Sequence, residues 1–293
     1  MYIGLDVGGT KIRGGLVDVD CKVIKVIERP TEAKKGKKVV IENIFSILNQ
    51  LDTKKVKGIG VAVRGFVDHD KGIVRKTTMM PGDFKRVKLA EIVRCKYKKP
   101  VKIENDTNCF ALAEAKLGAG RGKANVVGIT FGTGIGGGLI LNGELYRGFL
   151  GGAGEIGHMT MEAHSYKWNC GQKGCFESLC SGTAQSKIYK ELTGKVLSGR
   201  EVGEAYHTQD RKAVATYKQM AHNLSIALAN IIHFLDPDII VIGGGFSEVR
   251  FYFDSAIKNI DNFLVYKDIY KTKIKYAKLG KKAELVGATL LFR

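Results

Sequence analysis

The sequence has 293 residues, of which 47 are Lys or Arg and 29 are Asp or Glu, so its formal net charge is +18. Hydrophobic residues make up 44% of the chain, which excludes a disordered protein, and no apolar run reaches the roughly 18 residues that a membrane-spanning helix needs. Because the lysines occur in small groups without interleaved aromatic residues, we expect a solvated basic surface and no nucleic-acid or membrane partner.

The cysteines and the first residues indicate the compartment. Six cysteines are too few for a secreted disulfide scaffold, so free thiols or a metal site are expected instead of bridges. The chain opens MYIGLDVGG, without the basic and apolar progression of a signal peptide. We therefore expect a cytoplasmic protein, in which the 37 glycines mark turns and phosphate-binding loops.

The first part of the chain opens as a β-meander and then alternates helices with strands. Expected strands lie at residues 2–6, 12–17, 23–27, 58–63 and 101–103, and expected helices at 40–51, 89–93 and 109–116. Met79 and Met80 are expected to pack in the core. We place a boundary between two lobes near residues 105–120.

The second part repeats the order of strand, glycine turn and strand. Expected strands lie at 126–131, 138–141 and 239–242, and expected helices at 213–235 and 284–291. Asn142-Gly143 is a strong signal for a two-residue hairpin. Residues 151–182 read as a polar loop. This alternation predicts an α/β fold.

The segment Asp6-Val7-Gly8-Gly9-Thr10-Lys11 joins the first two strands. Its glycines let backbone N–H groups approach an anion, Thr10 and Lys11 add a hydroxyl and a charge, and Asp6 could organise a divalent cation that bridges phosphates. A plain hairpin turn with an aspartate cap explains the same residues, so both interpretations stay open.

A second glycine run, residues 130–138, contains Gly132-Thr133-Gly134 and formally matches GxGxxG. It continues into a strand instead of opening a helix, which excludes a dinucleotide-binding fingerprint, and the chain contains no P-loop motif. Two such loops suggest a nucleotide polyphosphate held between two lobes. Gly243-Gly244-Gly245 could offer a flat surface to a base or ribose, or form only a turn.

Residues 104–108, Glu-Asn-Asp-Thr-Asn, lie between an expected strand and an expected helix. Asn or Asp at this place is common as a helix N-cap. A carboxylate here could also be the general base that accepts a hydroxyl proton during phosphoryl transfer. The sequence leaves both roles open.

The loop that contains Glu155 and His158, and then Cys170 and Cys175, concentrates soft metal ligands. One His and a Cys-x4-Cys pair supply three of the four ligands that tetrahedral zinc prefers. Two buried thiols and a hydrogen-bonded histidine are the alternative explanation.

Taken in order, these motifs closely resemble the ROK family of sugar kinases, in the superfamily of hexokinase and actin-like ATPases. The resemblance covers nearly the whole chain. It is carried by DVGGTK, by GIGVAVRGFVD at residues 58–68, by Asn105-Asp106, by Gly132-Thr133-Gly134, by Glu155-Ile156-Gly157-His158 and by Cys170 through Glu177.

The resemblance implies a two-lobed ribonuclease-H-like α/β fold of the actin and hexokinase type, with a cleft between the lobes. The lobes would be residues 1–108, joined by a terminal helix at about 282–293, and residues 109–281, with a zinc-like loop at 155–177. Homodimers or homotetramers are common in the family, and we expect one here.

The implied activity is transfer of the γ-phosphoryl group of ATP, with Mg²⁺, to the 6-hydroxyl of a hexose. Glucose is the first expectation; a broad-specificity hexokinase or an N-acetylhexosamine kinase is the alternative, and a non-catalytic sugar sensor is the remote one. A family repressor would need a DNA-binding module before the first strand, which here begins at Tyr2. By the resemblance, Asp106 is the base, and the sugar-binding residues are Gly65, Asn105, Asp106, Glu155, His158 and Glu177. The ATP-binding residues are Asp6, Gly8, Gly9, Thr10, Lys11, Gly132, Thr133, Gly134, Gly243, Gly244 and Gly245.

Two positions depart from the family pattern. Trp168 stands where the first zinc cysteine is expected, which leaves His158, Cys170 and Cys175. His164, Cys180 or water could complete the zinc shell, or Trp168 packing or a disulfide between Cys170 and Cys175 could replace the metal. Arg64-Gly65-Phe66 stands where the family usually carries Pro-Gly-Pro, so Arg64 could change loop rigidity or sugar choice.

Overall fold

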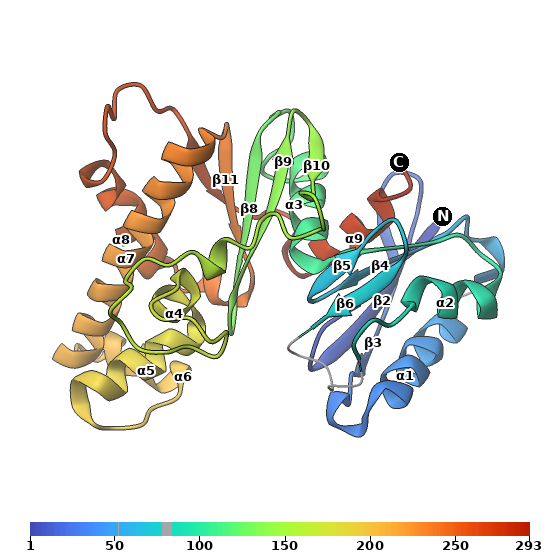
Figure 1. The fold of residues 1–293 in the computed structure, drawn as a ribbon, viewed down its shortest axis with the longest axis horizontal. Coiled ribbons are helices and arrows are strands. Elements are labelled where there is room, and N and C mark those ends of the chain that lie inside the picture. Colours follow the sequence, from blue (N-terminus) through green and yellow to red (C-terminus); the bar gives the residue numbers. More distant parts are fainter. Residues whose placement is uncertain (52, 78–83) are drawn as a thin grey trace. The chain divides into compact units, whose positions relative to one another are not determined.

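The structure is a computed structural model that describes residues 1–51, 53–77 and 84–293; Met79 and Met80 lie outside the described residues. The chain divides into two compact units (Figure 1). Unit 1 comprises residues 1–122, 138–154 and 278–293, and unit 2 comprises residues 123–137 and 155–277. Each unit is built on one five-stranded sheet, with the order β3-β2-β1-β4-β7 in the first sheet and β10-β9-β8-β11-β12 in the second.

The first sheet is mixed. Its strands are β1 (Tyr2–Val7), β2 (Lys11–Val17), β3 (Val23–Pro30), β4 (Ile59–Val63) and β7 (Val101–Asn105). The first three pair antiparallel, and β1, β4 and β7 run parallel, with Asp6 opposite Ala62 and Val63 opposite Asn105. Asp6 and Asn105 both lie near the carboxyl ends of their strands, and because β1 and β7 are both parallel to β4, these ends lie at the same edge of the sheet. A small hairpin, β5 (Phe66–Asp68) and β6 (Ile73–Lys76), follows β4.

Helices α1 (Lys37–Gln50), α2 (Leu89–Tyr97), α3 (Asp106–Leu117) and α9 (Ala283–Leu290) belong to unit 1. The helical period of α1 places Val40, Ile44, Ile47 and Leu48 on one buried face, in a core shared with the apolar side chains of β1 and β4. The C-terminal helix α9, red in Figure 1, packs on β1, β4 and α3. Gly60 permits this close approach, since a Cβ there would lie 1.9 Å from the carbonyl oxygen of Ala288.

The second sheet contains β8 (Val126–Phe131), β9 (Ile135–Leu141), β10 (Glu144–Tyr146), β11 (Ile239–Gly243) and β12 (Lys273–Tyr276). Strands β8, β11 and β12 run parallel, whereas β9 and β10 form an antiparallel hairpin. The turn of this hairpin is Asn142-Gly143, whose φ angles of 52° and 81° confirm the predicted hairpin. The division between the units runs through β9.

Five helices belong to unit 2: α4 (Phe176–Cys180), α5 (Gly182–Thr193), α6 (Gly199–His207), α7 (Arg211–Leu235) and α8 (Arg250–Asn259). The long helix α7 agrees with the sequence prediction, but α4, α5, α6 and α8 were not predicted, and α4 lies within residues 151–182, which were expected to form a loop. These helices contain only 5 to 12 residues, so each offers few turns in which a helical period can be recognised. A local signal did exist for α6, because Ser198 and Glu201 form a capping box at its start.

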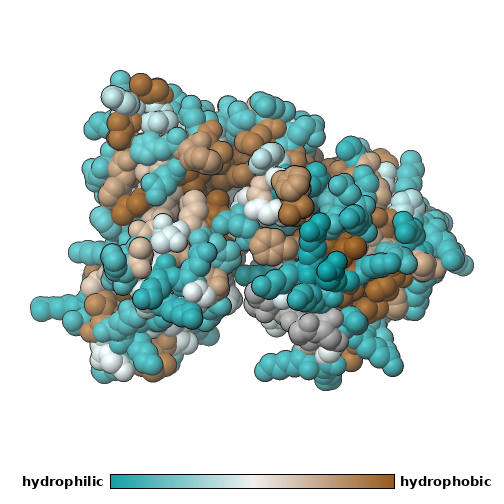
Figure 2. Space-filling model, viewed as in Figure 1, coloured by the Kyte–Doolittle hydropathy of each residue, from teal (hydrophilic) through white to brown (hydrophobic). Residues whose placement is uncertain are grey.

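No helix among the described residues is long and apolar enough to cross a membrane. Figure 2 shows hydrophilic side chains over most of the visible face, with apolar side chains in smaller groups between them. This distribution is the one expected for a charged chain whose lysines are scattered over its surface.

Candidate active site

The junction of β7 and α3 holds Asn105 and Asp106. Asn105 is the N-cap of α3, because its side-chain oxygen accepts hydrogen bonds from the N–H groups of Thr107 (2.8 Å) and Asn108 (3.0 Å). Its amide nitrogen donates to the carbonyl oxygen of Gly65 at 3.1 Å. The expected cap is therefore present, and it fixes the first turn of α3, where Asp106 follows.

The environment of Asp106 suits a proton acceptor. Burial of the carboxyl group raises its pKa to about 6, and the negative charge of Asp6 acts in the same direction, against the opposing attraction of Arg64. A carboxylate with this pKa is ionised at neutral pH yet basic enough to accept a hydroxyl proton. The N-cap and general-base interpretations thus fall on adjacent residues, Asn105 and Asp106.

Glu104, on the last part of β7, supports this junction from inside unit 1. It is 2% exposed, and its Oε1 accepts hydrogen bonds from the N–H group of Asn105 (2.8 Å) and from Nδ2 of Asn108 (3.0 Å). Its Oε2 accepts one from Nε of Arg147 at 2.6 Å. No sequence motif assigned a role to Glu104 or Arg147. The one signal in the sequence was Glu104 itself, a charged residue within a short strand that is buried at this point.

The first glycine loop joins β1 to β2, and the N–H group of Gly8 closes it by donating to the carbonyl oxygen of Lys11 at 3.0 Å. Asp6 is buried beside this loop. Its Oδ2 accepts hydrogen bonds from two nitrogens of Arg13, Nε at 3.1 Å and Nη2 at 2.5 Å. Burial raises the pKa of Asp6 although Arg13 opposes the shift. Arg13, a residue without a role in the sequence analysis, thus neutralises the carboxylate that we expected to organise Mg²⁺.

The second glycine loop and the Gly243–Gly245 run lie at one edge of the second sheet. Because β8 and β11 are parallel, with Thr130 opposite Gly243, both runs follow the carboxyl ends of adjacent strands. The N–H group of Gly182, at the start of α5, donates to the carbonyl oxygen of Gly132 at 2.9 Å. Gly244 has a φ of +83°, and a Cβ there would lie 2.3 Å from the carbonyl oxygen of Phe131, so only glycine fits.

The expected sugar-binding residues of unit 2 lie on two short helices. Glu155 precedes the 3₁₀ turn Ile156–His158, and its Oε2 is 3.7 Å from Nε2 of His158. Glu177 lies in the first turn of α4, where Oε2 accepts a hydrogen bond from the N–H group of Ile135 (3.0 Å) and Oε1 accepts one from Nε1 of Trp168 (2.7 Å). Trp168, which stands where the family pattern has a zinc-binding cysteine, therefore donates a hydrogen bond to an expected sugar-binding residue.

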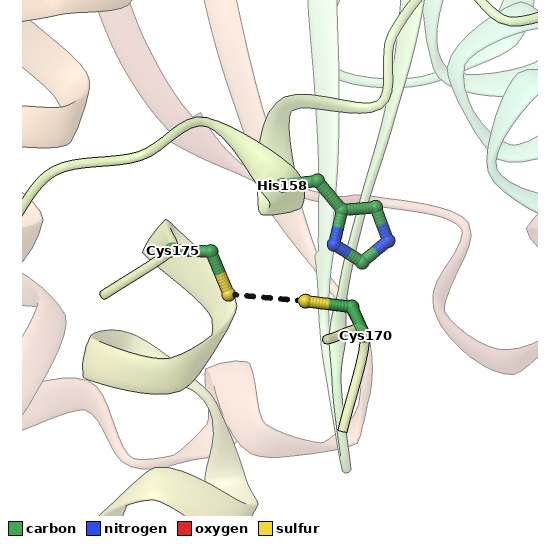
Figure 3. Close-up of side chains that lie close together, drawn as sticks. All are labelled: His158, Cys170 and Cys175. Carbon is green, nitrogen blue, oxygen red and sulfur yellow. Dashed lines mark hydrogen bonds between the residues drawn. The ribbon is translucent and has the colours of Figure 1, made fainter. Parts of the chain in front are cut away.

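Figure 3 shows His158, Cys170 and Cys175 converging from the 3₁₀ turn, the loop and the start of α4. Their ligand atoms lie within 4.8 Å of one another, and the two unbonded sulfur atoms are 3.8 Å apart. Nδ1 of His158 is buried without a hydrogen-bond partner among the described residues, so this nitrogen is available as a metal ligand. The donor set of one imidazole and two thiols therefore fits zinc.

The proposed fourth ligands do not join this cluster. Among the described residues, the group of potential metal ligands contains neither His164 nor Cys180. Cys180 is buried instead against the carbonyl oxygen of Met220, at 3.7 Å, and its burial raises the pKa of the thiol. Of the three fourth ligands that the sequence suggested, water is the one that remains.

Comparison with known proteins agrees with the motifs. The model of the ROK family matches residues 2–293. The chain is 32% identical to a glucokinase of Thermotoga maritima, over 99% of this chain and 96% of that protein, and 32% identical to an N-acetyl-D-glucosamine kinase of Haemophilus influenzae, over 100% and 99%. A ROK family glucokinase from Streptomyces griseus, solved in complex with glucose and AMPPNP, superposes with a TM-score of 0.86 at 29% identity, over 99% and 98% of the two chains.

These matches confirm the expected two-lobed α/β fold of the actin and hexokinase type. The chain belongs to the ROK family.

Proposed function

We propose that this chain is an ATP-dependent hexose kinase that phosphorylates the 6-hydroxyl group, with glucose as its first substrate. Membership of the ROK family supports a sugar kinase, and the relative solved with AMPPNP supports ATP as the donor. The observation that carries the proposal is Asp106, a carboxyl group with a pKa of about 6 at the first turn of a capped helix.

Asp106 accepts the proton of the 6-hydroxyl group as its oxygen forms a bond to the γ-phosphorus of ATP. The bond between that phosphorus and the β-phosphate oxygen breaks, and ADP leaves with the electron pair. The half-buried guanidinium of Arg64 is attractive to Asp106 in its ionised form, which keeps the base available at neutral pH. Mg²⁺, when bound, neutralises charge on the phosphates.

The glycine loops bind the nucleotide. Backbone N–H groups of residues 8–11 and 132–134 hold phosphate oxygens, and Thr10, Lys11 and Thr133 add side-chain donors. Gly243–Gly245 leaves room for the base or ribose, since a Cβ at Gly245 would meet no atom of the described residues within 4 Å. Asp6 would help to hold Mg²⁺ through water, with Oδ1 as the acceptor, because Arg13 binds Oδ2.

Asn105, Glu155, His158 and Glu177, with Gly65, bind the hydroxyl groups of the sugar. His158 has two ring nitrogens with different roles: Nδ1 joins Cys170 and Cys175 as zinc ligands, and Nε2, which lies near Glu155, contacts the sugar. His158, Cys170 and Cys175 would hold zinc, and the bound metal would fix the orientation of the His158 ring.

An N-acetylhexosamine kinase is the second candidate. One observation favours it: the N-acetyl-D-glucosamine kinase of Haemophilus influenzae is as similar to this chain as the glucokinase of Thermotoga maritima, at 32% identity each. The two substrates differ at the 2-position, so the choice depends on how much space the sugar pocket leaves there.

ADP release from MgATP tests the proposal, measured with glucose, mannose, fructose, glucosamine, N-acetylglucosamine and N-acetylmannosamine. We expect sugar-dependent release, highest kcat/KM with glucose, and 6-phosphate as the product. Higher kcat/KM with N-acetylglucosamine would select the second candidate. Sugar binding without ADP release from any member of the panel would overturn the kinase and favour a sensor.

A further inference from the structure

The carboxylate of Glu177 is held by two N–H donors, one on each oxygen. Nε1 of Trp168 donates to Oε1 at 2.7 Å, and the N–H group of Ile135 donates to Oε2 at 3.0 Å. A carboxylate has about four acceptor sites, so each oxygen keeps capacity for another hydrogen bond. The two donors fix the plane of the carboxylate, and the remaining acceptor sites stay available for ligand hydroxyl groups, because Glu177 is partly exposed.

The indole of Trp168 is itself held in place. Trp168 is 6% exposed. Its backbone N–H group donates to the carbonyl oxygen of Gln172 at 2.8 Å, and its backbone carbonyl oxygen accepts a hydrogen bond from the N–H group of Gly171 at 2.9 Å. The ring of Tyr166 lies beside the indole with centroids 6.0 Å apart, and Nζ of Lys187 is 5.5 Å from the indole centroid. An indole with these neighbours presents its N–H group in one direction.

The chemistry of the indole decides what it can do here. Nε1 is a donor without an accessible lone pair, so Trp168 cannot join His158, Cys170 and Cys175 as a metal ligand. A buried indole N–H needs a hydrogen-bond partner, and a backbone carbonyl group would satisfy it. In this chain the partner is instead the side-chain carboxyl group of Glu177, at 2.7 Å.

We propose that Trp168 is a positioning residue, which orients the carboxylate of Glu177 toward the hydroxyl groups of the sugar. The inference rests on the proposed function, since it takes Glu177 as a sugar-binding residue. It goes further in giving a role to the residue that stands where the family pattern has a cysteine: position 168 contributes to sugar affinity through a hydrogen bond instead of through a metal.

Trp168→Phe removes the N–H donor and keeps an aromatic ring. We expect the sugar KM to rise about tenfold, because a hydrogen bond to a charged group is lost, while the KM for ATP and kcat change less than about threefold. Tyr217→Phe is the matched control, since it removes another buried aromatic donor of unit 2, the hydroxyl that donates to Gln185 at 2.6 Å. This control should leave the sugar KM unchanged.

A double-mutant cycle with Glu177→Ala separates positioning from packing. If Trp168 acts through the carboxylate, Trp168→Phe should weaken sugar binding about tenfold in the wild-type background and less than about twofold in the Glu177→Ala background. Calorimetry measures the sugar Kd even where turnover is slow. An equal loss in both backgrounds would show that Trp168 supports the loop by packing alone, and would overturn the proposal.

Fluorescence gives a readout that needs no turnover, because Trp168 is the single tryptophan of the chain. Excitation moves electron density from the pyrrole side of indole toward the benzene ring, so a carboxylate at the N–H group shifts emission to longer wavelength. Glu177→Gln removes that charge and should shift the emission to shorter wavelength. An unchanged spectrum would refute the contact between Trp168 and Glu177. This measurement on Glu177→Gln also serves as the test if Trp168→Phe does not fold.

The two proposals fail in different ways. If the wild-type protein turns over sugar while Trp168→Phe keeps its sugar KM, the positioning role is wrong and the kinase stands. If the wild-type protein neither binds nor phosphorylates any sugar of the panel, the proposed function is wrong, and the positioning role falls with it.

Discussion

The two regions that supply the expected sugar contacts are built in different ways. In unit 1, the end of a buried strand and the first turn of α3 set Asn105 and Asp106, so backbone geometry places them. In unit 2, residues 155–177 contain only a 3₁₀ turn and the start of a five-residue helix, and side chains such as Trp168 and Glu177 hold one another. A change in the first region should therefore affect both the fold and the chemistry, whereas a change in the second should mainly affect ligand binding.

Asp106→Asn should have the largest effect. It removes the proposed base from the first region but keeps an oxygen that can accept from the N–H group of Thr107, as Oδ1 of Asp106 does at 3.0 Å. We expect kcat to fall by about 10²–10⁴-fold with the sugar KM nearly unchanged. Steady-state kinetics across pH should also show wild-type kcat/KM falling below a pH of about 6, where the carboxylate becomes protonated. A variant with kcat within about threefold of the wild type would remove Asp106 from the reaction.

Glu104→Ala tests whether the first region depends on its buried carboxylate. The substitution leaves Arg147, Asn108 and the N–H group of Asn105 without their acceptor. We expect the free energy of unfolding to fall by about 2–4 kcal/mol in urea titrations. Glu91→Ala is the control, because Glu91 is 49% exposed and pairs with Lys88 at 3.4 Å, and it should cost less than about 0.5 kcal/mol. Equal losses would mean that Glu104 supports nothing specific.

The raised pKa of Asp106 has a consequence for stability. Its ordinary pKa is 3.8 and its pKa in the folded protein is about 6, so the folded state binds the proton more tightly than the unfolded state. Stability should therefore fall as pH rises from about 4 to about 6, and the deficit should persist above pH 6. Asp106→Asn removes this deficit in stability. The variant should be more stable than the wild type at pH 7 by about 1–3 kcal/mol, and the two proteins should be nearly equal in stability at pH 4. A difference that did not change with pH would contradict this assignment.

Metal removal tests the second region. We expect about one zinc per chain by elemental analysis, and a rise of about tenfold in the sugar KM after chelation, reversed by added zinc. The KM for ATP should change little, because none of the three ligands lies on a glycine loop. Cys175→Ser should lose the metal, whereas Cys95→Ser, which changes an exposed cysteine outside the cluster, should keep it. Full sugar affinity in metal-free protein would show that side-chain contacts alone hold the loop.

The sequence predicted the parts of both regions that depend on local patterns. The cap at Asn105, the Asn142-Gly143 hairpin and the glycine runs after strand ends each have a short-range signal, because backbone conformation selects those residue types. The convergence of His158 with Cys170 and Cys175 was also predictable, from the spacing of ligand residues.

The remaining contacts join residues far apart in the chain. Glu104 and Arg147 are 43 positions apart, and Arg13 reaches the carbonyl oxygen of Lys281, 268 positions away, while it binds Asp6. Trp168 is only nine positions from Glu177, but the turn that brings its N–H group to the carboxylate has no sequence signature. Such pairs are set by packing, so a pattern within one segment cannot reveal them.

The smallest effect is expected at the first glycine loop, where backbone groups again do most of the binding. Lys11 is exposed, and its ammonium group lies 2.5 Å from Oε1 of Glu28 on β3. The hydrogen bond from Lys11 is the main cause that lowers the pKa of Glu28, so this carboxylate is ionised at neutral pH and competes with phosphate for Lys11.

Glu28→Gln should therefore lower the KM for ATP by about twofold at low salt without changing the free energy of unfolding, because exposed ion pairs contribute little to stability. Glu32→Gln removes the same charge from the exposed pair with Lys35 and should leave the KM unchanged. Steady-state kinetics at two salt concentrations distinguish the cases: a specific effect of Lys11 separates the two variants, and salt should reduce it by screening. Equal shifts in both variants would instead mean that ATP responds only to the overall positive charge.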